Sequence, residues 1–170
     1  ISVIEMTQQQ VGDDAIIVAP TGYHAEHAIQ LVNQAHEAGA NAGLVMPLSF
    51  PYLSDAGARD HLVRILDSSP LPMMVYKKAD IPSDDLLLEL AEHPNLVGVK
   101  YAVNNMDLFT RVIQADNGRI DWFCGTAERF APTREHWAAV LEAVEAERAS
   151  ERTEKLAFVS RLEELTEEHR

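Results

Sequence analysis

Short apolar runs alternate with amphipathic helical segments along most of this chain, at a nearly constant interval. Successive runs begin about 24 to 30 residues apart, the length of one strand, one helix and their connections. The runs are Ala15–Ala19, Ala42–Met46, Pro72–Tyr76, Leu96–Lys100 and Ile120–Cys124. Because the runs are almost wholly apolar, we expect parallel strands that are buried on both faces.

The segments between the runs show helical periodicity and recognisable ends. We expect helices at His24–Ala38, Ala58–Asp67 and Leu86–Glu92, and another that begins after Asn104 or Asn105. Gly39 is a typical C-terminal stop, and Pro94 should end the third helix. Ser83, followed by two aspartates, is a typical N-terminal cap. The pattern therefore predicts repeated strand–helix units.

Repeated units of this kind fit two architectures, an open doubly wound sheet or a closed (β/α)8 barrel. Dinucleotide-binding doubly wound folds carry a G-x-G-x-x-G turn after a strand, and no strand here runs into one. The sequence therefore favours an α/β protein of the (β/α)8 barrel class. We expect residues 1–132 to form part of the barrel and residues 133–170 to form a C-terminal helical segment.

Lys100 and Tyr76 each end an apolar run, where the catalytic side chains of a (β/α)8 barrel lie. The two residues are one strand–helix unit apart, so an amine and a phenol should meet on neighbouring strand ends. A neutral amine held out of water can attack a carbonyl, and a phenol held close can move a proton. The alternatives are a lysine that reaches from the core into water and an aromatic ring that fills the barrel mouth.

The composition excludes several classes of function. A formal net charge of -13 disfavours a nucleic-acid partner or an anionic membrane. The single cysteine, Cys124, cannot form an internal disulfide, which favours a reducing compartment, most simply the cytoplasm. The sequence contains neither a membrane-spanning apolar run nor a signal-peptide pattern. Since it begins at Ile1 without a methionine, we expect a trimmed or incompletely represented N-terminus.

Two blocks, Leu71–Tyr76 and Leu90–Lys100, resemble the core of the dihydrodipicolinate synthase and N-acetylneuraminate lyase family of class I aldolases and dehydratases. Ala38–Ala42 is similar to the family's helix-to-strand turn, and Trp122–Gly125 to its seventh strand. The resemblance covers residues 1–132. It implies a (β/α)8 barrel represented here without its first two strands and its eighth. We therefore expect the sequence to represent pieces of a longer polypeptide.

The resemblance also implies roles for residues. Lys100 would form a Schiff base with the ketone of a 2-keto acid, and Tyr76 would relay a proton. The protonated imine is an electron sink, so C–C cleavage, C–C formation or loss of water at the neighbouring carbon becomes accessible. No cofactor is expected, and the family implies a homo-oligomer, a tetramer built from dimers.

The loop at residues 47–54 bears on the substrate. It looks like the Pro-Tyr-Leu loop of sugar-acid dehydratases and lacks the paired tyrosines of the synthase branch, which favours a 2-keto-3-deoxy sugar acid. Condensation of pyruvate with an aldehyde is the alternative. The candidate substrate-binding residues are Pro47, Tyr52, Asn104, Gly125, Thr126 and Glu128. A helix cap at Asn104 and a solvated loop at Thr126 and Glu128 are equally reasonable readings.

Other readings of the chain are weaker. His24 and His27 share one helix face, but no third metal ligand accompanies them, so surface histidines and no metal are expected. Cys124 is most simply a small buried apolar group. A phosphate-binding barrel would need a glycine-rich loop, and the residues after Gly125 are not glycine-rich. A non-catalytic relative of the family remains the alternative to an enzyme.

Overall fold

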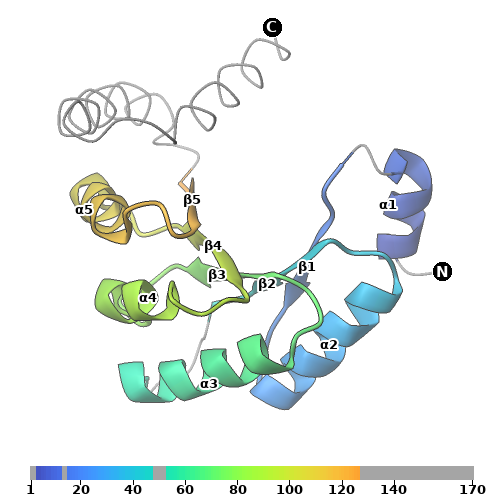
Figure 1. Cartoon of the computed structure of the whole chain (residues 1–170), viewed down its shortest axis with the longest axis horizontal. Coiled ribbons are helices and arrows are strands. Elements are labelled where there is room, and N and C mark those ends of the chain that lie inside the picture. Colours follow the sequence, from blue (N-terminus) through green and yellow to red (C-terminus); the bar gives the residue numbers. More distant parts are fainter. Residues whose placement is uncertain (1–2, 13–14, 48–52, 127–170) are drawn as a thin grey trace, which may run out of the picture. The chain divides into compact units, whose positions relative to one another are not determined.

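A computed structural model describes residues 3–12, 15–47 and 53–126, and within them five strands form one parallel sheet in chain order. The strands are β1 (Val18–Thr21), β2 (Ala42–Val45), β3 (Met73–Lys77), β4 (Leu96–Tyr101) and β5 (Asp121–Cys124). The helices are α1 (Val3–Val11), α2 (Ala25–Glu37), α3 (Asp55–Ser68), α4 (Asp84–Leu90) and α5 (Met106–Asp116). The predicted alternation of strand and helix is confirmed (Figure 1).

Side-chain oxygens cap the starts of several helices. Ser83 Oγ accepts the backbone N–H of Leu86 at 3.1 Å, as the sequence predicted. Asn105, rather than Asn104, caps α5, because its Oδ1 accepts the N–H of Leu108 at 3.1 Å. Gly39 follows α2 with a φ of 94°, a conformation that strains residues with a Cβ. Ser83 and Asn105 fix where the chain enters a helix, and Gly39 fixes where it leaves one.

The first strand differs from its predicted range, Ala15–Ala19. It begins at Val18 because the preceding turn occupies the backbone groups of Ile17: its N–H donates to Asn41 Oδ1 at 2.7 Å, and its carbonyl accepts the N–H of Asn41 at 2.8 Å. The strand also continues through Pro20 to Thr21. Within the described residues β1 pairs with β2, and Pro20 lies in register with Leu44 of that strand.

Two further expectations were wrong in detail. Helix α3 starts three residues before the predicted Ala58, since Ser54 Oγ caps it by accepting the N–H of Gly57. Helix α4 spans Asp84–Leu90 rather than Leu86–Glu92, and it ends before Pro94 is reached. The His93 N–H instead donates to the Leu90 carbonyl at 2.9 Å, which closes a turn after the helix.

Within the described residues the strands are buried on one face only, whereas the apolar runs predicted burial on both faces. Helices α2 to α5 lie along one face of the sheet (Figure 1), and the side chains on that face form the core. The core includes Val32, Val45, Ile65, Met73, Val75, Leu87, Val99 and Phe109. Side chains on the opposite face stay accessible, with Val18 40% and Phe123 48% exposed. In a closed barrel, that accessible face is the interior.

Two adjacent leucines of α4 allow the contribution of core packing to stability to be measured apart from that of helix propensity. Leu87 is 0% exposed and Leu88 is half-buried, so the two positions differ in burial more than in helical environment. Leu87→Ala should lower the free energy of unfolding by about 2–5 kcal/mol, because it leaves a cavity between α4 and the sheet. Leu88→Ala should cost clearly less. Urea unfolding followed by circular dichroism measures both, and equal losses would contradict the packing of α4 described here.

Candidate active site

The carboxyl ends of β3 and β4 bring Tyr76 and Lys100 side by side. The two residues are direct partners in the parallel register, and Lys100 also pairs with Phe123 of β5. Side chains alternate between the faces of a strand, so residues in direct register point to the same face. Lys100 and Tyr76 are both half-buried, on the face opposite the helices. The sequence had predicted this meeting of amine and phenol from the spacing of the strands.

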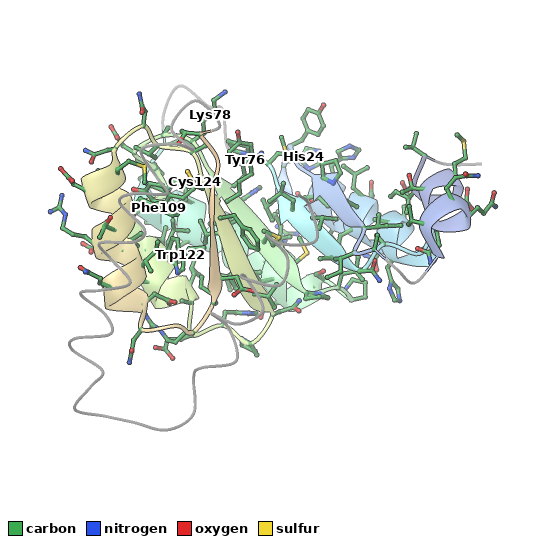
Figure 2. The ribbon with its side chains drawn as sticks, turned by 90° about the horizontal axis from the view of Figure 1, so that it is seen from above. His24, Tyr76, Lys78, Phe109, Trp122 and Cys124 are labelled. Carbon is green, nitrogen blue, oxygen red and sulfur yellow. The ribbon has the colours of Figure 1, made fainter. Side chains whose placement is uncertain are left out.

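The Lys100 amine lies over the face of the Tyr76 ring. Its Nζ is 4.2 Å from the ring centroid, well within the range of a cation–π contact. Figure 2 shows Tyr76 and Cys124 at the same end of the sheet, the end from which the chain also leaves toward Lys78. The contact holds a titratable phenol beside a primary amine at the edge where barrel enzymes carry out their chemistry.

The apolar side chain of Phe123 lies beside this pair. A Cβ added at Gly98 would lie 3.2 Å from Phe123 Cε2 and 3.6 Å from Met74 Cε, so these side chains gather over the glycine. It would also lie 3.0 Å from the Asp121 carbonyl oxygen, which leaves no room for a side chain. Gly98 thus lets the aromatic ring settle between β3 and β5, two residues before Lys100. The sequence did not single out Phe123 as part of the site.

The other predicted binding residues that the structure describes fall into two groups: accessible residues, and residues whose polar groups already contact other groups of the chain. Pro47 is half-buried just beyond β2, and Asn104 is exposed and free of the capping role that Asn105 takes. The Gly125 N–H donates to the Tyr101 carbonyl at 2.6 Å, and Thr126 is 7% exposed with its Oγ1 3.3 Å from Cys124 Sγ. Tyr52 and Glu128 lie outside the described residues, as does the predicted helical segment 133–170.

The histidine pair serves the fold. His24 caps α2 because its Nδ1 accepts the N–H of His27 at 3.3 Å, and Glu26 Oε2 lies 3.2 Å from the same nitrogen. Among the described residues, no group of three or more histidine, cysteine or acidic side chains is arranged to hold a metal ion. None of the helices in the same residues is long and apolar enough to cross a membrane.

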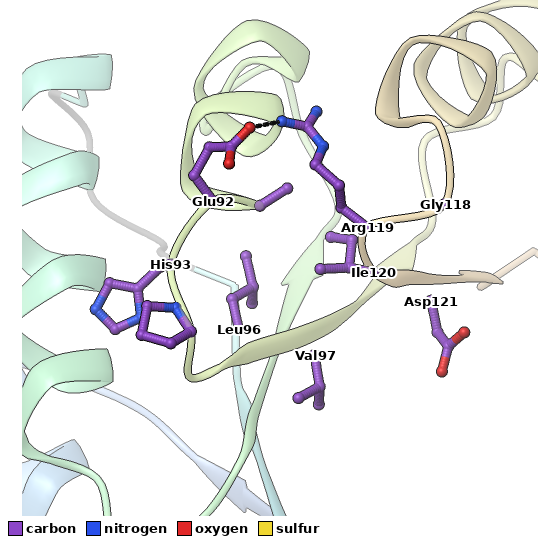
Figure 3. A pocket seen from close by; sticks show the side chains of 10 residues that line it. Glu92, His93, Leu96, Val97, Gly118, Arg119, Ile120 and Asp121 are labelled. Carbon is purple, nitrogen blue, oxygen red and sulfur yellow. Dashed lines mark hydrogen bonds and ion pairs between the residues drawn. The ribbon is translucent and has the colours of Figure 1, made fainter.

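A shallow depression lies at the other end of the sheet. It has a volume of about 350 Å³ and is lined by residues at the starts of β4 and β5 and just before them, among them His93, Leu96 and Ile120 (Figure 3). Glu92 and Arg119 form an ion pair at its rim. Because it opens at the amino ends of the strands, it lies away from Lys100, at the end of a barrel that usually serves stability.

Comparison with known proteins identifies the family. The model of the dihydrodipicolinate synthetase family matches residues 1–157. The chain belongs to this family. The resemblance read from the tyrosine and lysine blocks is confirmed, and with it the fold: the described sheet and helices are part of a (β/α)8 barrel.

Relatives within the family carry different activities. A probable 5-dehydro-4-deoxyglucarate dehydratase of Rhodococcus opacus is 32% identical over 136 residues, covering 76% of this chain and 44% of the relative. A probable mitochondrial 4-hydroxy-2-oxoglutarate aldolase of Emericella nidulans is 32% identical over 106 residues, 58% of this chain and 34% of the relative. The chain thus spans less than half the length of these relatives.

A solved structure gives the same result. The dihydrodipicolinate synthase of Oceanobacillus iheyensis superposes with a TM-score of 0.72 at 35% identity, covering 81% of this chain and 47% of that one. The family therefore includes dehydratases, aldolases and synthases that resemble this chain to a similar degree. Overall similarity alone does not choose among these activities.

Besides Phe123, sequence reasoning missed three residues near the site. Lys77 follows Tyr76 and is 3% exposed, and Tyr101 follows Lys100 and is 1% exposed. Both side chains reach Asp84, the first residue of α4. The alternation of side chains along a strand was the available signal, because it sends the residue after each candidate to the helix-covered face.

Gly125 is held too tightly for a side chain. An added Cβ would lie 2.7 Å from Ala102 Cβ and 3.1 Å from the Tyr101 carbonyl oxygen. We expect Gly125→Ala to lower the free energy of unfolding by about 1–3 kcal/mol, as overpacking does. Gly57→Ala is the control, because its Cβ would meet only Ser54 Oγ at 3.4 Å and alanine favours the helix. Denaturant unfolding compares them; an unchanged stability in Gly125→Ala would contradict the close approach.

His61 of α3 should make the stability depend on pH. Burial, the largest cause, lowers the pKa of His61 from its ordinary value of 6.5; Glu26 opposes this shift and His24 adds to it. The folded chain then binds fewer protons than the unfolded chain, so the free energy of unfolding should fall as the pH drops below about 6.5.

The variant His61→Gln should flatten this dependence between pH 7 and pH 5, because it removes the imidazole. The exposed residue His36 provides the control variant His36→Gln, which removes a histidine without changing the half-buried His61. Melting temperatures measured across that range test the effect. A slope in His61→Gln as steep as in the unaltered chain would show that other groups cause it.

Proposed function

We propose that this chain carries the Schiff-base centre of a lyase that acts on a 2-keto acid. The observation that carries the proposal is the Lys100 amine, which lies 4.2 Å from the Tyr76 ring centroid at neighbouring strand ends. Membership of a family with dehydratase and aldolase relatives supports a lyase in general. The Schiff-base mechanism comes to this chain from the family and from the chemistry of the two side chains.

The first step joins the amine to the substrate. The neutral amine of Lys100 attacks the ketone carbon of the 2-keto acid to give a carbinolamine, and loss of the hydroxyl as water leaves an imine. Tyr76 would donate the proton that the departing hydroxyl needs and would recover a proton from the nitrogen side. Phe123 pairs directly with Lys100 in the register and adds an apolar side chain to the same face.

The second step uses the imine as an electron sink. Once protonated, the imine nitrogen accepts the electron pair of the neighbouring carbon, so a proton can leave that carbon or a C–C bond to it can break. Expulsion of a hydroxyl one carbon further would give dehydration, and release of an aldehyde would give aldol cleavage. Tyr76 would exchange the proton at the leaving oxygen in either case.

For the substrate we propose a 2-keto-3-deoxy sugar acid. The support is the Pro47–Ser54 loop pattern together with relatives named as 5-dehydro-4-deoxyglucarate dehydratases. Among the predicted contacts, Pro47 and Asn104 are accessible beyond β2 and before α5, where substrate hydroxyls would be met. Pyruvate condensation with an aldehyde is the alternative, favoured by the solved synthase relative. Homo-oligomeric assembly and a cytoplasmic location complete the proposal.

Reductive trapping tests the centre directly. Incubation with pyruvate and borohydride should convert the imine into a stable secondary amine at Lys100, detected by intact mass and peptide mapping. Lys100→Met should abolish the adduct, whereas Lys78→Met, which removes an exposed lysine near the same sheet edge, should leave it intact.

In the same assay, Tyr76→Phe should slow trapping by about a hundredfold, the usual worth of a positioned proton-transfer group. An unaltered protein that forms no adduct would overturn the Schiff-base proposal and favour a non-catalytic relative. An adduct on another lysine would overturn the role given to Lys100.

A further inference from the structure

Lys77 is a buried cation with a complete set of partners. Its Nζ donates to the carbonyl oxygens of Ala79 at 3.0 Å, Asp80 at 3.2 Å and Pro82 at 2.5 Å. The same nitrogen lies 3.3 Å from Asp84 Oδ1. A charge 3% exposed would be costly without such partners, so it fixes the chain after β3 as a closed turn.

Asp84 joins this cation to the neighbouring strand. The Tyr101 hydroxyl donates to the Asp84 carboxylate, 3.1 Å from each oxygen. The Tyr101 ring is stacked on Phe109 of α5 with the centroids 5.1 Å apart, and Lys77 Nζ lies 5.7 Å from the Tyr101 centroid. The carboxylate at the start of α4 therefore holds one side chain from β3 and one from β4.

The network lies next to the candidate active site in the register of β3 and β4. Lys77 pairs directly with Tyr101, one step after Tyr76 pairs with Lys100. The Lys77 carbonyl also accepts the N–H of Ala102 at 2.8 Å, which continues the pairing past the strand ends. Since side chains alternate, the network lies on the helix face directly behind the Lys100–Tyr76 contact.

We propose that Lys77, Asp84 and Tyr101 are positioning residues that hold Tyr76 against Lys100 for proton transfer. The inference rests on the Schiff-base function proposed above and adds to it the groups that set its geometry. Neither Lys77 nor Tyr101 points to the substrate face, so both act through the backbone of the residue before them. A slip or rotation of either strand end would change the distance between the phenol and the amine.

Stability alone accounts poorly for this arrangement. Replacing a buried ion pair with apolar groups of similar size is often neutral or stabilising, so the pair adds little that packing could not. The network instead fixes the orientation of the strand ends. One carboxylate can accept from side chains of both strands only at one register and one rotation of each strand end. Proton transfer is sensitive to displacements of this kind, and a misplacement of 1 Å can cost about a hundredfold in rate.

Pyruvate–borohydride trapping on the natural polypeptide tests the inference. Asp84→Asn and Tyr101→Phe should each lower the trapping rate constant at saturating pyruvate about tenfold, with the half-saturating pyruvate concentration little changed. Asp85→Asn is the matched control, since Asp85 is an exposed carboxylate in the same turn of α4. Val75→Ala is the stability control, because Val75 is 2% exposed on the same face of β3 and bears no polar group.

A double-mutant cycle identifies the route of the effect. If Tyr101 acts by holding Tyr76, Tyr101→Phe should change the rate less than about twofold once Tyr76 is already phenylalanine. A second tenfold loss in that background would overturn the inference, as would an equal loss in Val75→Ala or Asp85→Asn. An unaltered protein that forms no adduct would overturn the proposed function itself. If the unaltered protein forms the adduct and the variants Asp84→Asn and Tyr101→Phe form it equally fast, only the positioning role would be overturned.

Discussion

The parallel pairing of β3 with β4 is the constraint on which the rest of this structure depends. Tyr76 pairs with Lys100 and Lys77 with Tyr101, so one register decides the neighbours on both faces at once. A slip of one residue would turn one strand's side chains to the other face. Lys77 would then bring its charge to the open face and leave Asp84 without its cation. The buried network and the accessible pair therefore require the same register.

Small residues let the two faces specialise. Gly98 leaves room for Phe123 and Met74 on the accessible face, and an added Cβ at Gly43 would come within 2.5 Å of Met73 Sδ on the helix face. Because Gly98 and Gly43 have no side chain, larger side chains of the neighbouring strands can lie over them. Packing of this kind brings the strands close together on both faces. The opposite face forms the core, while the face that carries Lys100 stays accessible within the described residues.

The sequence predicted the parts of this arrangement that depend on periodicity. Strand spacing placed Tyr76 and Lys100 on neighbouring strand ends, and the short family pattern around them implied their chemistry. Prediction from the sequence was less accurate where a backbone group has two possible hydrogen-bond partners. Asn41 takes the backbone groups of Ile17 and delays the start of β1, and nothing in the apolar run from Ala15 announces this.

The Lys77–Asp84–Tyr101 network could not be found from spacing for a different reason. Its members are far apart in the sequence, and each has an ordinary local reading: Lys77 as a polar residue after a strand, Asp84 as an acidic first-turn residue, Tyr101 as a strand aromatic. Only the docking of α4 across both strand ends brings their polar atoms within hydrogen-bond distance. The direction of side chains along β3 and β4 follows from the sequence, whereas their common partner does not.

The two lysines at the ends of β3 and β4 differ in how their amines are bound by the surrounding groups. Lys77 donates to three carbonyl oxygens and faces a carboxylate, so its nitrogen has no free direction from which to attack a carbonyl. Within the described part of the chain, the contact recorded for the Lys100 amine is the face of the Tyr76 ring. A ring face orients the nitrogen without accepting a hydrogen bond from any one N–H. Schiff-base chemistry needs an amine that is oriented but not committed, and of the two it is Lys100 that meets this condition.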